Sequence, residues 1–442
     1  MLTASIFKAN DIRGIVGTEW DLDGVRAIGT AYGALVGAPA IVLGRDMRLT
    51  SPAVHDAFLD AVRRTGVAVT DIGLASTDGL WFASGRLGVP GVQITSSHNP
   101  AEYNGLKFCA AGAAPVTGEF LAELARLSQA IDAGVAGTVT AVDTLPQYVD
   151  YLLGQVDHSG WRPLTVVVDA GNGMAGLTVP PVLDRLGVGL VGLYMDLDGA
   201  FPNHPANPLD PANLVDAQRA VREAGADAGF VFDGDADRVF VIDERGEVVS
   251  PSAIAAMIAV REVAAHPGAT IVVNTVTSQS VAEMVAERGG TVVVSPVGHT
   301  YMKAAMAAHG AVFGGEHSAH YYFQEFFGAD TGLLAALRIL EQLGRTTTPL
   351  SAVAASYTRY AASGEINARV TDPPGVMATI AERLGAGAET TWGDGVMIRG
   401  DGWWVSVRPS NTEPLLRLNV EAADPGLMAS LRDTALAYMK EE

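Results

Sequence analysis

Three stretches of this chain repeat one order of elements. Each stretch has an apolar strand, an amphipathic helix, a second strand, and a third strand that ends in a polar loop and returns as a short apolar segment. The three final loops are TSSHNP (95–100), DGDADR (233–238) and GEHSAH (315–320). Strand–helix–strand order is typical of α/β sheets, whose ligands gather at the carboxyl ends of the strands. The repeat therefore predicts three α/β domains with mixed, mainly parallel sheets, each with the hairpin strand as one antiparallel edge strand, arranged so that the three loops face one central cleft.

The last part of the chain follows a different pattern. At 442 residues the chain is too long for a single core, and the three repeats end near residue 360. Beyond that point alternating strands are flanked by helical patterns at 376–385 and 425–442. This indicates a smaller C-terminal α+β domain. We expect four domains, with the boundaries 1–147, 148–248, 249–360 and 361–442.

Composition limits the classes of partner. The chain has 49 acidic and 29 basic residues, a formal net charge of −20, which repels nucleic acid and anionic membranes. No stretch has the apolar length of a membrane span or the pattern of a signal peptide. The single cysteine, Cys109, cannot form an internal disulfide and suits a reducing compartment. We therefore expect a cytoplasmic monomer or homodimer that acts on a small molecule, with neither nucleic acid nor membrane as a partner.

The loop 95–100 lies between an apolar run and an Asn-Gly turn signal, as expected for a strand that returns as a hairpin. Pro100 lacks a backbone donor and biases Asn99 towards an extended conformation. Such a loop can present a hydroxyl for chemistry, although a polar turn at a strand end is often only a turn. Ser97 and His98 do not form a hydrolase pair, because adjacent side chains diverge and a G-x-S-x-G elbow is absent.

Of the three loops, 233–238 gives the most specific indication of function. Asp233, Asp235 and Asp237 follow an apolar strand at alternate positions, so a curled backbone would bring their carboxylates to one point. Their mutual repulsion then requires a cation, and oxygen ligands of this kind suit Mg²⁺ with a position left for a phosphate oxygen or water. The spacing of the aspartates also resembles a calcium EF-hand, but that loop requires Gly at the position of Arg238. The residues after the loop have the pattern of an apolar strand and not of a helix, so the EF-hand interpretation fails. An acidic surface turn is the remaining alternative.

Two further motifs suggest other chemistry. The G-x-G-x-x-G sequence at 171–176 follows a strand, as in a dinucleotide site, but Pro180 and Pro181 are expected to break the helix that such a site needs. His317 and His320 would suggest zinc, yet no helix is expected there to bring them together. Recognition of sugar hydroxyls by the polar side chains of that loop fits better.

The loop RPSNTEP (408–414) in the last domain is rich in hydrogen-bond donors. It offers a guanidinium, two hydroxyls, an amide and consecutive backbone N–H groups at the end of a strand. Phosphate is bound by such a combination of forked and main-chain donors. A proline-bracketed turn with a surface arginine is equally consistent with these residues alone.

The four loops, in this order and at these separations, resemble the signature loops of the α-D-phosphohexomutases, and FKANDIRG (7–14) resembles the opening segment of that family. The resemblance covers nearly the whole chain and is greatest to members that act on mannose phosphates, or on mannose and glucose phosphates. It implies an intramolecular phosphotransferase that interconverts mannose 6-phosphate and mannose 1-phosphate. A phosphoserine enzyme and a hexose 1,6-bisphosphate, both intermediate and activator, are implied with it.

The resemblance also implies roles for individual residues. Ser97 matches the serine that carries the phosphoryl group, and with Asp233, Asp235 and Asp237 it matches the ligands of one Mg²⁺ per chain. The sugar-reading loop is matched by Glu316, Ser318 and His320. The pocket for the non-reacting phosphate is matched by Arg408, Ser410, Asn411 and Thr412, with Arg417 assisting. The lining of the reacting centre is matched by Arg13, His98, Lys107, Arg238 and His299, among which Lys107 and His299 are candidates for acid or base.

This sequence departs from the common family pattern at a few positions. Ser96 stands where Ala is frequent, and we expect Ser97 to be the reactive serine because it directly precedes His-Asn-Pro. Ala319 stands where the family usually has Gly, and Asn10 stands where it often has Tyr. Thr300 occupies a position that varies within the family. These departures leave the preferred sugar open, so phosphoglucomutase or phosphoglucosamine mutase activity is an alternative. A non-catalytic phosphosugar-binding relative is the alternative from another class.

Overall fold

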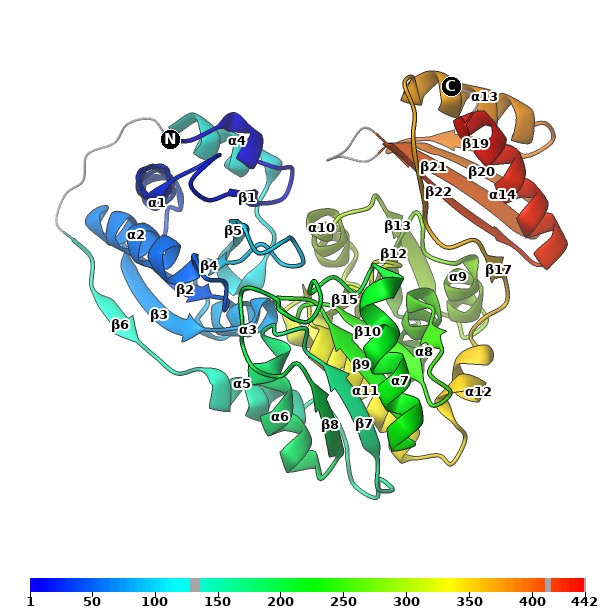
Figure 1. The fold of residues 1–442 in the computed structure, drawn as a ribbon, viewed down its shortest axis with the longest axis horizontal. Coiled ribbons are helices and arrows are strands. Elements are labelled where there is room, and N and C mark those ends of the chain that lie inside the picture. The colour runs from blue at the N-terminus through cyan, green and yellow to red at the C-terminus, as the bar shows by residue number, and fades with distance from the viewer. Residues whose placement is uncertain (128–135, 410–414, 441–442) are drawn as a thin grey trace.

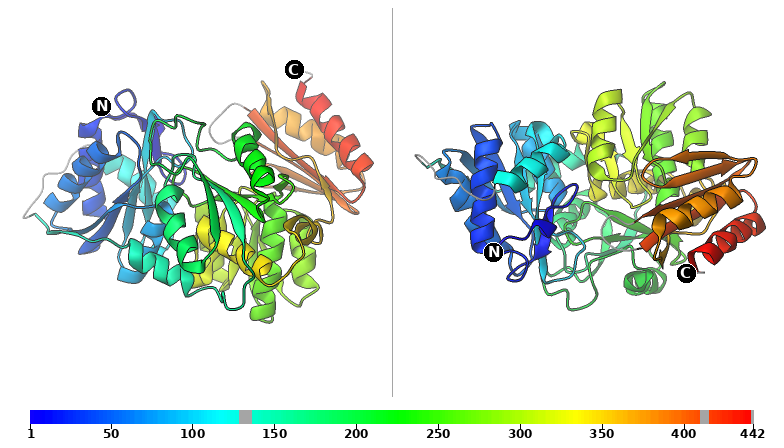
Figure 2. Two further views of the ribbon diagram at one scale, coloured as in Figure 1. Left: turned by 60° about the horizontal axis from the view of Figure 1, so that its bottom comes forward. Right: turned by 90° about the horizontal axis from the view of Figure 1, so that it is seen from above.

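The computed structural model describes residues 1–127, 136–409 and 415–440, and four β-sheets organise it. We use domains 1 to 4 for the segments 1–147, 148–248, 249–360 and 361–442. The domains follow one another in an arc with domains 1 and 4 at its ends (Figure 1), as two further views also show (Figure 2). The predicted class, three α/β domains and a smaller α+β domain, is confirmed.

Domain 1 contains a six-stranded sheet in the order β1-β5-β4-β2-β3-β6. Its strands are β1 (Ile12–Ile15), β2 (Ala40–Arg45), β3 (Ala68–Leu74), β4 (Gly91–Ile94), β5 (Tyr103–Cys109) and β6 (Val139–Ala141). Its helices are α1 (Leu22–Leu35), α2 (Ser51–Arg64), α3 (Thr77–Leu87) and α4 (Gly118–Leu127), and α5 (Leu145–Leu153) leads into domain 2. Strands β2, β3, β4 and β6 are parallel, whereas β5 returns antiparallel to β4.

Domains 2 and 3 each contain a five-stranded sheet, in the orders β11-β10-β9-β7-β8 and β13-β12-β14-β15-β16. The elements of domain 2 are β7 (Thr165–Asp169), α6 (Ala175–Leu186), β8 (Gly189–Leu193), α7 (Val215–Ala224), β9 (Ala228–Phe232), β10 (Val239–Asp243) and β11 (Val248–Val249). Those of domain 3 are α8 (Pro251–Ala265), β12 (Thr270–Asn274), α9 (Gln279–Ala286), β13 (Thr291–Ser295), α10 (His299–His309), β14 (Phe313–Gly315), β15 (Tyr321–Phe323), β16 (Ala329–Asp330), α11 (Gly332–Gly344) and α12 (Leu350–Ala355). In both sheets a parallel core continues into an antiparallel hairpin.

Domain 4 contains a sheet in the order β17-β22-β21-β20-β19, with β18 also paired to β22. Its elements are β17 (Ala361–Ala362), β18 (Ile366–Arg369), α13 (Pro373–Leu384), β19 (Glu389–Trp392), β20 (Val396–Gly400), β21 (Trp403–Pro409), β22 (Leu415–Ala422) and α14 (Pro425–Lys440). All of its strand pairs are antiparallel. Short 3₁₀ helices elsewhere in the chain lie at Ala4–Ile6, Ala111–Ala113, Pro211–Leu214 and Gln324–Phe326.

The sheets differ from the expectation in one respect. The repeat suggested that the hairpin strand forms the edge of each sheet, but the short strands β1, β11 and β16 pair with its outer side. An unpaired edge exposes a row of backbone donors and acceptors, and these short strands cover it. They are too short to give a clear alternating pattern in the sequence.

Helix α6 also contradicts an expectation. Pro180 and Pro181 lie inside the helix, which begins within the glycine motif and continues past both. The prolines remove two backbone donors without ending the helix. The dinucleotide interpretation fails for a different reason: a Cβ at Gly173 would lie 2.7 Å from the carbonyl oxygen of Gly234. Gly173 thus packs against the 233–238 loop, and this glycine allows a close contact between the two loops.

The buried apolar side chains form separate cores of unequal extent. One continuous core joins domains 2 and 3 to α3 and α5, through side chains such as Trp81 and Tyr148. The rest of domain 1 has a second core, and domain 4 has a third of its own between its sheet and its two helices. Apolar burial is the main stabilising term in such packing. Domains 1 to 3 are therefore held together by shared core, whereas contacts such as the bond from Gln279 N–H to Glu421 Oε2 (3.3 Å) link domain 4 to domain 3.

Within the described residues, the helices lack the combination of length and hydropathy that crossing a bilayer requires.

A buried histidine in domain 1 connects α2 to β3. The Nε2 atom of His55 lies 3.0 Å from Asp71 Oδ1, and its Nδ1 atom lies 3.1 Å from Asp56 Oδ1. Burial alone would lower the pKa of His55, but the hydrogen bonds to both carboxylates outweigh it and raise the pKa. A raised folded-state pKa stabilises the fold below the unfolded pKa of about 6.5, and this stabilisation is lost as the pH rises through the folded-state value.

We therefore expect the stability of the wild type and of His55→Gln to diverge with pH. At about pH 6 the wild type should unfold at the higher temperature, and the difference should shrink towards about pH 9 as the imidazole loses its proton. Thermal unfolding followed by circular dichroism measures this difference. Equal differences at the two pH values would show that the charged imidazole does not stabilise this helix–strand contact.

Candidate active site

The three repeated loops meet at one place. Ser97, in the loop after β4, donates a hydrogen bond from Oγ to Asp233 Oδ2 at 2.8 Å. Arg238, at the end of the second loop, forms a backbone bridge with His320 of the third loop. Residues from domains 1, 2 and 3 are therefore in direct contact, as the equivalent positions of the loops predicted.

Ser97 has a backbone conformation that few residues other than glycine adopt. Its φ is 50°, and its N–H is bound by Thr95 Oγ1 at 3.0 Å. This turn directs Oγ towards Asp233, with His98 Nδ1 at 3.2 Å and Arg238 Nη2 at 3.3 Å. Strained conformations of this kind often occur where a side chain must be presented for function.

The neighbouring hydroxyl, Ser96, faces elsewhere. Its Oγ lies 3.4 Å from Asn99 Oδ1 within the same loop, and its side chain is buried. Of the two adjacent serines, only Ser97 forms a hydrogen bond to an aspartate of the second loop within the described part of the chain. This geometry supports the prediction that Ser97 is the reactive serine. The sequence predicts the same choice because His-Asn-Pro directly follows Ser97.

The three aspartates form a buried cluster. Ala236, with φ of 64°, curls the loop, and ligand oxygens of Asp233, Asp235 and Asp237 lie within 4.8 Å of one another. The Oδ1 atoms of Asp235 and Asp237 are buried and have no hydrogen-bond partner in the described part of the chain. Buried carboxylate oxygens without donors are costly unless a cation compensates them. The donor set thus fits a divalent metal ion that prefers oxygen ligands.

Two cations partly neutralise this cluster. Lys107 Nζ on β5 donates to Asp235 Oδ2 at 2.7 Å and to Asp237 Oδ2 at 2.6 Å. Arg238 donates from Nη2 to Asp233 Oδ2 at 2.7 Å. Burial would lower the pKa of Lys107, but the two aspartates outweigh it and raise the pKa. Burial, with the neighbouring carboxylates of Asp235 and Asp237, still raises the pKa of Asp233 to about 7 against the opposing charge of Arg238, so the two cations do not fully compensate the three carboxylates.

Other predicted residues of the reacting centre surround this cluster. Arg13 on β1 donates from Nη1 to Asn99 Oδ1 at 2.8 Å and from Nε to Asp11 Oδ2 at 2.7 Å. Burial lowers the pKa of His98 well below its usual value, and the positive charge of Arg238 adds to the effect. Burial also lowers the pKa of His299, at the start of α10, to about 3. Both imidazoles are therefore neutral near pH 7.

The predicted sugar loop combines a fixed carboxylate with two more accessible side chains. Glu316 is buried and accepts hydrogen bonds from Asn274 Nδ2 at 2.8 Å and from the Tyr322 hydroxyl at 2.7 Å. Ser318 Oγ and His320 Nδ1 are 2.9 Å apart and half-buried. His320 Nε2 lies 3.9 Å from Asp237 Oδ1, so this loop directly adjoins the metal loop.

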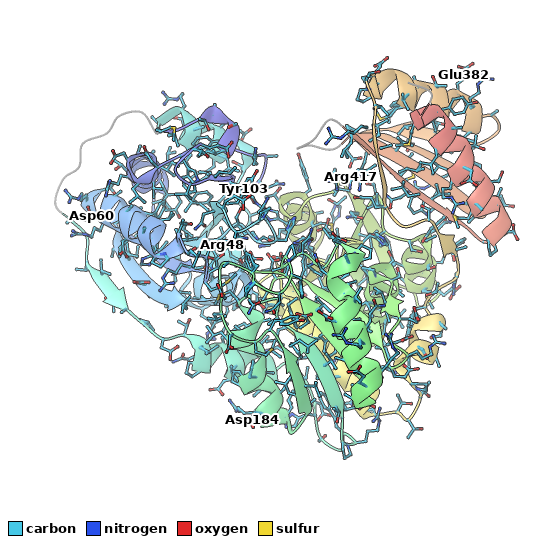
Figure 3. All side chains as sticks on the ribbon, viewed as in Figure 1. Arg48, Asp60, Tyr103, Asp184, Glu382 and Arg417 are labelled. Carbon is cyan, nitrogen blue, oxygen red and sulfur yellow. The ribbon has the colours of Figure 1, made fainter. Side chains whose placement is uncertain are left out.

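Arg417, one of the predicted phosphate residues, lies at the end of the domain 4 sheet that is nearest domain 1, where Figure 3 labels it. Arg408 on β21 is opposite Arg417 on β22, and both guanidiniums contact the carboxylate of Glu365, at 3.1 and 3.2 Å. Two guanidiniums held side by side in this way suit an anion with several oxygens. The other predicted phosphate residues, Ser410, Asn411 and Thr412, lie outside the described residues.

Some residues of the site were missed by the sequence analysis. Thr77 at the start of α3 donates from Oγ1 to Asp235 Oδ2 at 2.6 Å and from its N–H to the Asp235 carbonyl at 2.9 Å. Asp330 approaches Asp237 and His320, and Lys303 Nζ lies 3.3 Å from its Oδ1. The signal for Thr77 was present, because Ser-Thr-Asp also follows a strand of the first repeat. Asp330 and Lys303 gave no motif that could have identified them.

Four family models match the chain. Their descriptions are phosphoglucomutase/phosphomannomutase α/β/α domain I at residues 4–134, domain II at 146–246 and domain III at 250–360, with the C-terminal domain at 365–437. The chain therefore belongs to the phosphoglucomutase/phosphomannomutase family, which confirms the resemblance of the four loops.

Individual relatives agree over the full length. The chain is 36% identical to a phosphomannomutase of Salmonella typhimurium over 100% of both chains. It is 38% identical to a protein of Xanthomonas campestris pv. campestris named phosphohexose mutases, over 99% of both. A crystal structure of a phosphoglucomutase/phosphomannomutase family protein from Burkholderia thailandensis matches with a TM-score of 0.91 and 33% identity, over 100% of this chain and 99% of that one.

Proposed function

We propose that this chain catalyses the reversible transfer of a phosphoryl group between O6 and O1 of a hexose phosphate, with mannose 6-phosphate and mannose 1-phosphate as the first candidate pair. The observation that carries the proposal is the position of Ser97 Oγ, 2.8 Å from an aspartate of a buried cluster that suits a divalent ion. The names of the full-length relatives support the choice of mannose phosphate. Phosphoglucomutase or phosphoglucosamine mutase activity is the alternative within the class.

The reaction begins with a phosphoryl group on Ser97. The bond between phosphorus and Ser97 Oγ breaks as a bond from phosphorus to the free hydroxyl oxygen of the substrate forms, and the proton of that hydroxyl passes to a base in the site. The product is a hexose 1,6-bisphosphate, which turns over so that its other phosphoryl group returns to Ser97 by the reverse steps. Lys107 and His299 are the candidates for the acid or base of this step.

Charge neutralisation and alignment supply most of the catalysis in phosphoryl transfer. Asp233, Asp235 and Asp237 would hold Mg²⁺, with an oxygen of phosphorylated Ser97 as a further ligand. The ion neutralises charge on the phosphoryl group when it is bound. Lys107 and Arg238 add fixed positive charge beside the same group, within a chain whose net charge is −20.

The third and fourth domains orient the substrate in this proposal. In this proposal Glu316, Ser318 and His320 recognise hydroxyls of the sugar, and Arg408 and Arg417 bind the phosphate that does not react. Because the bisphosphate must present each end to Ser97 in turn, one phosphate pocket serves both orientations. Domain 4 has a core of its own, which allows it to loosen for the turn and to close for each transfer.

A coupled assay tests the proposal. Protein whose intact mass has been checked for one added phosphoryl group is supplied with mannose 1-phosphate or glucose 1-phosphate, Mg²⁺ and the matching 1,6-bisphosphate. We expect conversion of both sugars to their 6-phosphates, with kcat/KM for the mannose substrate at least equal to that for glucose. A higher value for glucose 1-phosphate would reassign the substrate, and the same assay with glucosamine 1-phosphate tests the remaining alternative. Binding of hexose phosphates without any conversion would identify a non-catalytic relative.

A further inference from the structure

Arg48 lies beneath the loop that carries Ser97 and belongs to none of the groups of site residues described above. Its side chain is fully buried, at 0% exposure. Nη2 donates to the carbonyl oxygens of Ser97 and Asn99, both at 2.7 Å. Nη1 donates to those of Pro100 at 2.7 Å and Tyr103 at 2.9 Å. A single planar guanidinium therefore binds four peptide groups of one short loop, in the region where Figure 3 labels Arg48 and Tyr103.

The charge of Arg48 is compensated and covered by its surroundings. Its Nε lies 3.3 Å from Asp46 Oδ2, and its own N–H donates to Asp46 Oδ1 at 3.0 Å. The ring of Phe201, from the second domain, lies 5.2 Å from the guanidinium carbon. Gly199 approaches so closely that a Cβ there would be 2.5 Å from Arg48 Cα. The guanidinium thus lies between the serine loop of domain 1 and a loop of domain 2.

The serine loop needs such a group for a physical reason. Ser97 has a φ of 50°, a conformation that the chain does not adopt readily without support. Four carbonyl dipoles that point at one place also repel one another unless a cation lies between them. Arginine presents its donors in a rigid fork, which spans several acceptors, whereas the donors of lysine radiate from one nitrogen.

We propose that Arg48 is a positioning residue for the phosphoryl-carrying serine: it fixes the peptide groups between residues 97 and 103 so that Ser97 Oγ returns to the same place opposite Asp233 after each transfer. This inference rests on the proposed function, in which one hydroxyl must be aligned for transfer twice in every cycle. Displacement of a reacting group by about 1 Å can cost about 10²-fold in rate. Arg48 makes no contact with substrate in this scheme and acts only through the loop.

The variant Arg48→Lys in the full chain tests this role. We expect kcat to fall by about 10²-fold while KM for the hexose phosphate changes by less than about threefold, because the pocket residues are untouched. The matched control is Arg338→Lys in α11. Arg338 is also buried, at 2% exposure, and donates to the carbonyl oxygen of Gln155 at 2.6 Å, away from the serine loop. Its kcat should stay at the wild-type value.

Two results would overturn the inference: wild-type kcat in Arg48→Lys, or an equal loss of kcat in both lysine variants. If Arg48→Lys does not fold, as judged by circular dichroism, Asp46→Asn replaces it. That variant keeps the shape of the side chain but removes the charge beside Arg48, and we expect a kcat loss of about tenfold with KM again nearly constant. Wild-type kcat in Asp46→Asn would equally overturn the role. An inactive but phosphorylated wild type would instead refute the proposed function.

Discussion

Ser97→Ala is expected to lower kcat for hexose phosphate isomerisation by at least about 10⁴-fold, because the variant has no oxygen to carry the phosphoryl group between the two transfers. The intact protein should also fail to gain the mass of one phosphoryl group when it is incubated with the bisphosphate. The fold should persist, because Asp233 Oδ2 keeps two hydrogen bonds from the Arg238 guanidinium when the Ser97 hydroxyl is removed. Isomerase assay and intact mass spectrometry measure the two effects.

The adjacent serine provides the matched control. Ser96→Ala removes a hydroxyl from the same loop, one residue away, that faces Asn99 at 3.4 Å instead of the aspartates. This variant should keep the phosphoryl mass and lose no more than a few-fold in kcat. If Ser96→Ala were inactive and Ser97→Ala active, the phosphoryl group would have to be carried on the other hydroxyl. If both variants isomerised sugar phosphates, a covalent role for this loop would be refuted.

Asp235→Asn is expected to give the second largest loss. Asp235 accepts bonds from Thr77 and Lys107 on Oδ2, while its buried Oδ1 has no partner among the described residues. The amide keeps the volume of the side chain but removes one of the three negative charges that suit Mg²⁺. We expect kcat/KM to fall by roughly 10³-fold, equivalent to about 4 kcal/mol, and Mg²⁺ to bind more weakly. Isothermal titration with Mg²⁺ and assays over a range of Mg²⁺ concentration measure both quantities.

The same hairpin contains a control aspartate. Asp243, at the far end of β10, is also buried and accepts bonds from the N–H groups of Arg245 and Glu247, both at 2.9 Å. Asp243→Asn changes one buried charge in domain 2 without touching the cluster. It should leave Mg²⁺ affinity near the wild-type value even if stability falls. Unchanged Mg²⁺ affinity in Asp235→Asn, or an equal loss in both variants, would argue against the three-aspartate site.

The sequence predicted the parts of the site that are encoded locally. An apolar strand that breaks into polar residues locates a strand end, and three such breaks identified the loops that contain Ser97, the three aspartates and Glu316. Spacing alone identified the aspartate cluster, because alternate positions on a curled loop converge. The same local reasoning identified the donor-rich loop 408–414 of domain 4, of which Arg408 is among the described residues, whereas Arg417 was identified by the family resemblance.

The remainder depends on tertiary packing that no local pattern reveals. Arg48 follows a strand in the first repeat, but its four carbonyl partners lie about fifty residues further along the chain. Pro180 and Pro181 argued for a helix break, yet packing of α6 in the shared core outweighs the lost backbone bonds. The edge strands β1, β11 and β16 exist because a hairpin strand offers them partners, and their own residues carry little strand signal.

The separate core of domain 4 has a consequence for how the molecule denatures. Segments that share apolar packing melt as one cooperative unit, whereas a segment with its own packing can melt by itself. Heat or urea can therefore disorder the C-terminal segment first, while the serine and the aspartate cluster remain assembled. A partly denatured population of this kind would keep Ser97 and the aspartates together while it loses the arginine pair of domain 4, so partial unfolding need not disrupt the aspartate cluster.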